Sequence, residues 1–128
     1  WLAGETEHPE HGHTAQAVVA GTASPQDLRA MAARYLMFAK REDGMPLDPV
    51  ARFHLGNGAE LHELHAEADL SPNGRSQSGG VMVNYLYDLS KTERHHEEFA
   101  THATIEASRS VRAASTAALA AKPKENTA

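Results

Sequence analysis

The spacing of apolar residues predicts a first helix that runs from Ser24 to Arg41. Apolar side chains recur three or four positions apart, as one face of a helix requires: Leu28, Met31, Ala32, Tyr35, Leu36 and Ala39. Ser24 can accept hydrogen bonds from free backbone N–H groups, and Pro25 suits the first helical position. Lys40 and Arg41 would complement the helix dipole in the last turn, before the sequence EDGMP at 42–46 ends the helix.

A second, shorter helix is predicted by the same signals. Asp48 can act as its cap and Pro49 fits its first position. One face of this helix would carry Val50, Phe53 and His54, which lie at positions i, i+3 and i+4. Gly-Asn-Gly at 56–58 tolerates a left-handed backbone and is expected to end the helix, so that His54 lies beside a sharp turn.

Two strands are predicted after this turn. Residues 59–66 are ambiguous because Leu61 and Leu64 have helical spacing, but their position after a glycine turn favours a strand. The sequence VMVNYLYDL at 81–89 alternates with a period of two and predicts a strand. Because both of its faces are largely apolar, we expect this strand to be buried. The intervening 69–80 is rich in Ser, Pro, Asn and Gly and is expected to be a loop.

The last segment predicts one long helix. Ser90 can cap it, with Glu93 three residues later. A sparse apolar stripe follows, made of Phe99, Ile105 and Val111. The alanine-rich run RSVRAASTAALAA also favours helix. Pro123 would end the helix, which leaves 123–128 as a disordered tail.

These elements define an α/β protein of the α+β class, with one domain over 1–122. Residues 5–23 are polar and small, and we expect them to form a loop with at most one short turn. Two strands do not make a stable sheet alone. The remaining strands are therefore expected from missing sequence or from a partner chain.

Composition narrows the class of protein without identifying it. The chain has 128 residues, 41% hydrophobic and 23% charged, with a net charge of -5. An acidic chain gives no support to nucleic-acid binding, and no apolar run approaches the roughly 20 residues of a membrane span. The absence of cysteine excludes disulfides and thiolate chemistry. The chain begins at Trp1, which fits either a piece of a longer protein or a trimmed terminus.

Nine histidines raise the possibility of a metal site. A cluster at His8, His11 and His13 could bind zinc or nickel adventitiously, but a solvated polar loop is the preferred interpretation. His62 and His65 are spaced i and i+3, whereas the zincin motif needs i and i+4, so we expect no metal there. The histidines of the last helix are expected to be solvated: His95, His96 and His102.

His54 is different because apolar residues flank it. Phe53 and Leu55 should partly desolvate its imidazole, whose ordinary pKa near 6.5 suits proton transfer at neutral pH. Spacing alone leaves two interpretations open: an acid/base group, or a helix-end histidine that bonds a backbone carbonyl.

Several motifs, in one order and spacing, resemble the C-terminal part of malonyl-CoA decarboxylase. The most specific are PVARFHLGNGA at 49–59, the AD.S..G run at 68–74 and SGGVMVNYLYDL at 78–89. The resemblance is close over 48–89 and extends back to about Ala33.

The resemblance implies the C-terminal portion of a catalytic domain with a GNAT-like acyltransferase fold, in which helices pack on a mixed sheet. The family converts malonyl-CoA to acetyl-CoA and carbon dioxide in fatty acid metabolism, without a metal or organic cofactor. Its catalytic histidine falls on His54, and its partner serine lies upstream of a Trp-Leu pair. Since this chain begins at Trp1-Leu2, we expect the serine on the preceding polypeptide or on a partner chain, and no activity from this chain alone.

Decarboxylation leaves an enolate, which hydrogen-bond donors can stabilise and an acid must protonate. Candidates for orienting or binding the substrate are Asn57, the backbone N–H groups of Gly56 and Gly58, and Tyr85. A packing or turn role is the alternative for each of them. Asn84 also matches the family, although an asparagine within a strand is often structural.

The chain departs from the family at one place in this region. His65 and Ala66 stand where the family usually has asparagine and tryptophan, which removes a large apolar contact. The C-terminal sequence ENTA is not a peroxisomal signal, so a cytoplasmic protein of bacterial type is expected. An exposed sheet edge would also favour a homo-oligomer.

Two other functions remain open at this stage. The changes at His65 and Ala66 would suit a related acyl-CoA enzyme of the same fold, either a transferase or a decarboxylase of another malonyl-type thioester. The missing serine would suit a non-catalytic interaction subunit.

Overall fold

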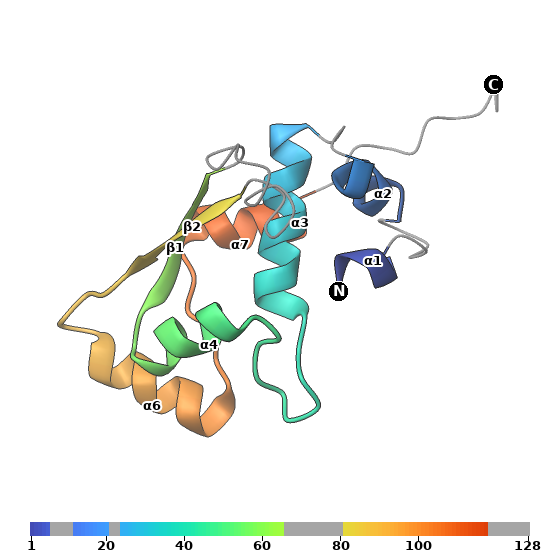
Figure 1. The fold of residues 1–128 in the computed structure, drawn as a ribbon. Helices are drawn as coiled ribbons and strands as arrows, with labels where there is room; N and C mark the ends of the chain where they lie inside the picture. Colours follow the sequence, from blue (N-terminus) through green and yellow to red (C-terminus); the bar gives the residue numbers. More distant parts are fainter. Residues whose placement is uncertain (6–11, 21–23, 66–80, 118–128) are drawn as a thin grey trace, which may run out of the picture.

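The computed structural model describes residues 1–5, 12–20, 24–65 and 81–117, which form helices around one pair of strands (Figure 1). Its elements, in chain order, are α1 (Leu2–Glu5), α2 (Gly12–Ala20), α3 (Pro25–Phe38), α4 (Pro49–Gly56), β1 (Glu60–His65), β2 (Met82–Leu86), α6 (Thr92–His102) and α7 (Arg109–Thr116). This mixture of helices with an antiparallel strand pair confirms the α+β class. Within the described ranges, no helix is both long and apolar enough to cross a membrane.

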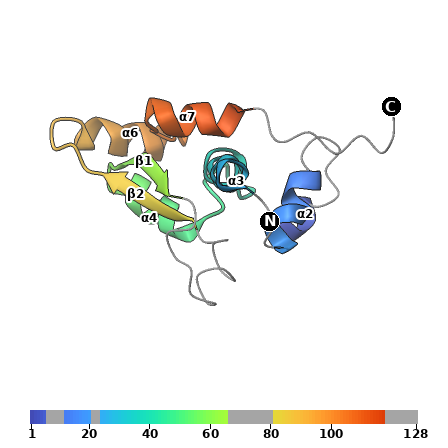
Figure 2. The ribbon, with the colours of Figure 1, turned by 90° about the horizontal axis from the view of Figure 1, so that it is seen from above.

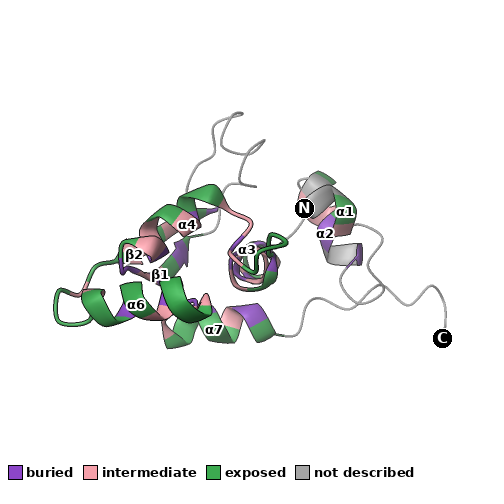
Figure 3. Cartoon of the chain, turned by 90° about the horizontal axis from the view of Figure 1, so that it is seen from below, coloured by how far each residue is buried: buried purple, intermediate pink, exposed green. Residues whose placement is uncertain are grey.

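The strands β1 and β2 pair antiparallel, with an irregularity in register between Leu61 and Glu63. On the other edge of β1, the backbone of Leu61 donates to Glu106 O at 2.8 Å and accepts from Ser108 N at 2.8 Å. The segment between α6 and α7 therefore runs beside β1. From above and from below, the strand pair lies between α4 on one side and α6 with α7 on the other (Figures 2 and 3).

The core lies where these layers meet α3. Its buried members come from every layer: Leu28, Ala33, Leu36, Ala51, Leu55, Leu61, Leu64, Val81, Phe99, Ile105 and Val111. By contrast, α6 is exposed along most of its length and buries only His95 and Phe99 (Figure 3). Its attachment to the rest of the molecule therefore depends on few side chains.

The predicted starts of α3 and α4 are confirmed. Ser24 Oγ accepts from Asp27 N at 3.1 Å, and Asp48 Oδ2 accepts from Ala51 N at 2.9 Å. The ambiguous residues after the glycine turn form β1, as preferred. These successes share a cause, because capping and turn chemistry act over a few neighbouring residues.

Several boundaries differ from the predictions. The α3 helix ends at Phe38, so Lys40 lies beyond its last turn, in a bridge with Pro46. Ser90 does not cap α6, because its hydroxyl donates to Asp88 Oδ1 at 2.7 Å while Lys91 occupies the cap position.

The predicted single C-terminal helix is two helices. Ala103 has a left-handed φ of 55°, which ends α6, and Ile105 packs from the connection instead. Ser108 then caps α7 by accepting from Val111 N at 3.2 Å. The prediction of a loop over 5–23 was wrong for Gly12–Ala20, which form the nine-residue helix α2, whereas 6–11 and 21–23 lie outside the described residues. The expected loop at 69–80 and the tail at 123–128 lie outside the described residues.

Burial was overestimated for two elements. We expected β2 to be buried on both faces, but Met82 is 46% exposed and Leu86 is 39% exposed. On α4, Ala51 and Leu55 face the core, whereas Val50 and Phe53 point outward. Apolar side chains of both elements are thus left on the surface of this chain.

Candidate active site around His54

His54 lies at the end of α4, between two tyrosines of the β2 segment. Its imidazole stacks on the ring of Tyr85, with centroids 4.1 Å apart and planes inclined by 20°. Its Nδ1 forms a hydrogen bond of 2.7 Å with the hydroxyl of Tyr87. Phe53 meets the imidazole edge-on at 5.2 Å. An aromatic face and a hydroxyl therefore hold the ring from two directions.

The contact with Tyr87 occupies one ring nitrogen and leaves Nε2 for chemistry. A neutral imidazole has one donor and one acceptor nitrogen. When Nδ1–H donates to Tyr87, Nε2 carries the lone pair and can take a proton; after it does, the ring can return that proton to a substrate. In the described part of the chain, Nε2 has no hydrogen-bond partner. The geometry suits an acid/base group that works through Nε2.

Tyr85, which stacks on the imidazole of His54, is a neutral side chain with a polar hydroxyl. Burial raises the pKa of Tyr85 well above its ordinary value, and the negative charge of Asp48 raises it further. The phenol therefore keeps its proton at neutral pH and remains a hydrogen-bond donor.

The start of α4 is anchored to α3. Tyr35 donates its hydroxyl to Asp48 Oδ1 at 3.0 Å, while the other oxygen of Asp48 caps α4. Burial, followed by the charge of Asp48, raises the pKa of Tyr35 to about 12. Arg52 donates to the carbonyls of Pro46 and Leu47 at 3.0 and 3.1 Å, which holds the preceding loop against the helix.

The turn after His54 uses its polar groups internally. Asn57 Nδ2 donates to Phe53 O at 3.0 Å, and Gly58 N donates to Leu55 O at 3.0 Å. Gly58 has a φ of 91°, and a Cβ there would overlap the backbone carbonyl of Thr92. The structure thus brings His54 and Tyr85 together, and it gives the amide of Asn57 and the N–H of Gly58 partners within the turn.

Two histidines of α6 hold the same turn, and the expectation of a solvated side chain was wrong for His95. His95 is 5% exposed, and its Nδ1 lies 3.2 Å from Gly58 O. Nδ1 of His96 lies 2.6 Å from Gly56 O, although the residue is exposed. A carbonyl can only accept, so both imidazoles donate from Nδ1. His102 is exposed and contacts Glu98 at 3.4 Å.

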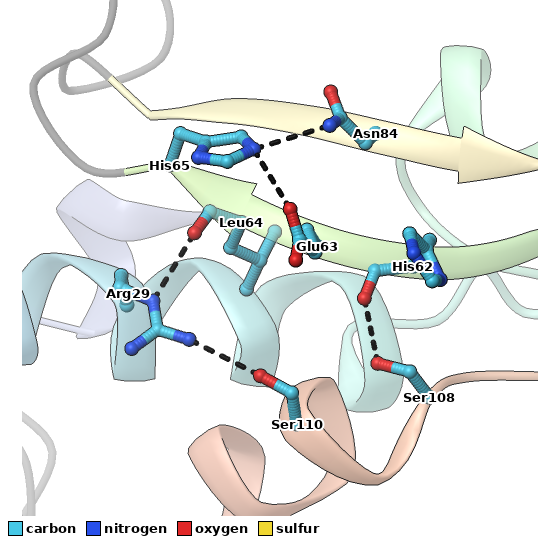
Figure 4. A network of polar contacts seen from close by, with 8 residues as sticks. All are labelled: Arg29, His62, Glu63, Leu64, His65, Asn84, Ser108 and Ser110. Atoms are coloured by element: carbon cyan, nitrogen blue, oxygen red, sulfur yellow. Dashed lines mark hydrogen bonds and ion pairs between the residues drawn. The ribbon is translucent and has the colours of Figure 1, made fainter.

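His65 of β1 belongs to a separate polar group on the strand pair (Figure 4). His65 Nε2 lies 3.2 Å from Glu63 Oε2 and 3.1 Å from Asn84 Nδ2. Nearby, Arg29 donates to Leu64 O at 3.1 Å, which ties α3 to β1. This arrangement gives Asn84 a cross-strand structural contact with the residue that departs from the family pattern.

No cluster of metal-binding side chains is present among residues 1–5, 12–20, 24–65 and 81–117. These ranges contain no group of three or more His, Cys, Asp or Glu that could hold an ion. His8 and His11 lie outside them, and so does the side chain of His13.

Tyr87 is the site residue that sequence reasoning missed. A signal for it was present, because Tyr85 and Tyr87 are two apart in a strand-like segment and therefore share one face. Once Tyr85 was placed near His54, the same alternation would have placed Tyr87 there too.

Comparison with known proteins identifies the family of this chain. Residues 6–127 match the family described as malonyl-CoA decarboxylase C-terminal domain. The mitochondrial malonyl-CoA decarboxylase of Anser anser anser is 39% identical over 77 residues, which are 60% of this chain and 15% of that protein. The one from Rattus norvegicus is 41% identical over 58 residues, 45% of this chain and 12% of that protein.

Solved structures agree in fold as well as in sequence. A crystal structure of malonyl-CoA decarboxylase from Rhodopseudomonas palustris has a TM-score of 0.78 and 40% identity, covering 89% of this chain and 30% of that one. One from Agrobacterium vitis has a TM-score of 0.69 and 40% identity, covering 91% of this chain and 27% of that one.

The mixed α+β fold of this chain is thus shared with a class of decarboxylases. The chain belongs to the malonyl-CoA decarboxylase family and corresponds to its C-terminal domain. It spans less than a third of the length of each of these relatives.

Proposed function

We propose that the complete protein containing this chain decarboxylates malonyl-CoA to acetyl-CoA and carbon dioxide, with His54 as the acid/base group. The observation that supports this proposal is the position of His54, stacked on Tyr85 and bonded through Nδ1 to Tyr87. The resemblance to malonyl-CoA decarboxylases implies the same role, because the catalytic histidine of that family falls on His54.

The proposed reaction breaks the bond between the α carbon and the carboxylate of the malonyl group. Carbon dioxide leaves, and the electron pair moves into the thioester to form an enolate. Nε2 of His54, which has first taken a proton from solvent, passes that proton through a serine hydroxyl of the preceding polypeptide to the α carbon, and the ring returns to its neutral form. Tyr85, which stays protonated, is available to orient the substrate or to donate to the enolate oxygen. As the resemblance implies, no metal or organic cofactor enters the proposal.

Large apolar side chains around His54 are exposed in this chain, which suggests that another part of the protein covers them. Phe53 is 64% exposed, Val50 is 54% exposed and Tyr87 is 42% exposed, all beside His54 on α4 or bonded to it. Large exposed apolar side chains grouped in this way mark a contact surface. We propose that the preceding serine-bearing polypeptide covers them and completes a GNAT-like domain.

The test is His54→Ala in the complete protein, followed by the release of carbon dioxide from malonyl-CoA. Losing the acid/base group should lower kcat by roughly a thousandfold. The matched control is His102→Ala, which removes an exposed histidine of α6 and should leave kcat within about twofold. Near-normal decarboxylation by the His54 variant would refute the proposal. Methylmalonyl-CoA as a second substrate would show whether the changes at His65 and Ala66 alter the acyl group that is accepted.

A further inference from the structure

We propose that His95 and His96 are positioning residues: together they clamp the Gly56–Gly58 turn and thereby hold His54 against Tyr87. This inference rests on the proposed role of His54, but it concerns different side chains. Among the described residues, the hydrogen bonds of His95 and His96 go to the turn and not to His54, Tyr85 or Tyr87. Both act through the backbone of the turn that ends the helix carrying His54.

The two contacts engage the carbonyls on either side of Asn57. His95 donates Nδ1–H to Gly58 O from a position that is 5% exposed, and His96 donates to Gly56 O at 2.6 Å. The carbonyls of a helix end lack partners within the helix and must find them elsewhere. Adjacent residues on one helix supply both partners here, so α6 fixes the position and the tilt of the turn.

Close packing at the same place makes the clamp rigid. A Cβ on Gly58 would overlap Thr92 O and its side chain, so the first turn of α6 lies directly against the Gly58 backbone. The ring of Phe99 lies 3.8 Å from where a Cβ of Gly56 would be. This packing already prevents the turn from moving toward α6. The hydrogen bonds of His95 and His96 also oppose movement of the turn away from α6.

The start of α6 is also tied to Tyr87, through the next residue in the chain. Asp88 follows Tyr87 in the chain, and its carbonyl accepts from Lys91 N at 2.8 Å, from Thr92 N at 3.0 Å and from Thr92 Oγ1 at 2.8 Å. The contacts therefore form a closed ring. It runs from Tyr87 through Asp88 into α6, from the two histidines to the glycine turn, and back through His54 to the Tyr87 hydroxyl.

This ring explains how a short hydrogen bond is kept between two side chains 33 residues apart. If the turn moves away from α6, His54 moves with it, while Tyr87 stays with the start of α6. Displacements of about 1 Å in a catalytic group can lower rates by up to about a hundredfold. The clamp should therefore affect kcat more than KM, since it sets the position of His54 and touches no substrate.

The experiment uses the complete protein and replaces the two donors separately. His95→Phe and His96→Leu remove the Nδ1 donor, whereas His95→Asn and His96→Asn place an amide N–H near the same point. We expect each removal to lower kcat by roughly 10- to 100-fold, with KM within about threefold. The asparagine variants should recover most of the loss. His102→Leu, on the same helix but without a carbonyl partner in the described residues, should stay within about twofold of the parent.

A double-mutant cycle with Tyr87→Phe separates positioning from general destabilisation. If the clamp acts by holding His54 against Tyr87, removing Tyr87 first should leave little for His96→Leu to change, and the double variant should lose no more than about threefold beyond the larger single loss. A role confined to folding would instead make the two losses multiply.

Three results would overturn the inference: kcat values within twofold for both removal variants, multiplicative losses in the cycle, or no recovery with asparagine. Should His95→Phe fail to fold, the exposed His96 carries the same test without a buried substitution. A clamp that fails while His54→Ala abolishes activity leaves the proposed function intact. Activity that survives in His54→Ala removes the proposed function itself.

Discussion

Two helix contacts of this chain are made by different means. The α3–α7 contact buries apolar side chains of one core cluster, with Leu36 at 4% and Val111 at 0% exposure (Figure 2). At its exposed rim, Arg29 and Arg34 of α3 also donate to Ser110 Oγ and Ala117 O. The α4–α6 contact instead joins imidazole N–H groups to two glycine carbonyls. Apolar burial is non-directional, whereas a hydrogen bond weakens steeply once its angle departs from linear. The first contact stabilises the fold, and the second fixes where one side chain lies.

The largest effect should come from adding a methyl group at the second contact. Gly58→Ala would place a Cβ against Thr92 O at a φ of 91°. We expect about 4 kcal/mol lost from the free energy of unfolding, the sum of a strained backbone and overpacking. Activity should fall further than the unfolded fraction explains. Denaturant unfolding and decarboxylation assays on the complete protein measure both.

Gly44→Ala is the matched control for this substitution. Gly44 also has a left-handed φ, 84°, but nothing lies within 4 Å of its missing Cβ. Only the backbone term of about 1 kcal/mol should appear, with normal activity. Equal losses for Gly44→Ala and Gly58→Ala would show that packing against α6 contributes nothing.

A truncation at the first contact should lower stability and leave catalysis unchanged. Leu36→Ala removes a buried side chain from α3 and should cost about 3 kcal/mol in the free energy of unfolding. The kcat of the folded protein should remain that of the parent, because no hydrogen bond to the His54 turn is lost. Gln26→Ala, at an exposed position of the same helix, provides the reference. A large fall in kcat for Leu36→Ala at full folding would erase the distinction between the two contacts.

The smallest effect concerns Tyr35, which connects α3 to α4 through Asp48. The pKa of Tyr35 is raised from 10.0 to about 12 by burial and by the charge of Asp48. The folded state therefore holds its proton more tightly than the unfolded state, so the stabilisation is complete below pH 10 and is lost as the pH rises toward about 12. Tyr35→Phe should show a shallower fall of unfolding free energy over this interval. Equal slopes in both proteins would contradict the assignment.

What the sequence predicted and what it missed follow from the range of the interactions. Ser24 and Asp48 cap their helices through contacts three residues away, and both starts were predicted. Ala103 ends α6 in a left-handed conformation without the glycine that usually signals it, so the break was missed. A continuous stripe through Phe99 and Ile105 was the natural interpretation of that pattern.

The site shows the same limit more sharply. His54 was singled out by its motif, but its partner Tyr87 is 33 residues away in the chain. His95 and His96 contact carbonyls 37 and 40 residues away, and their own helix is polar on its exposed face. Periodicity describes neighbours within one element, so it predicted solvated histidines where tertiary structure gives them backbone partners.

The buried hydrogen bond of His95 also offers a way to measure local opening of the molecule by hydrogen exchange. A proton on Nδ1, covered by the fold and bonded to Gly58 O, exchanges with water only when the turn and α6 separate. In nitrogen-15-labelled histidine spectra, its exchange rate would report how often that separation occurs. This single imidazole would thus report local opening of the contact between the turn and α6 in the resting protein, without substrate.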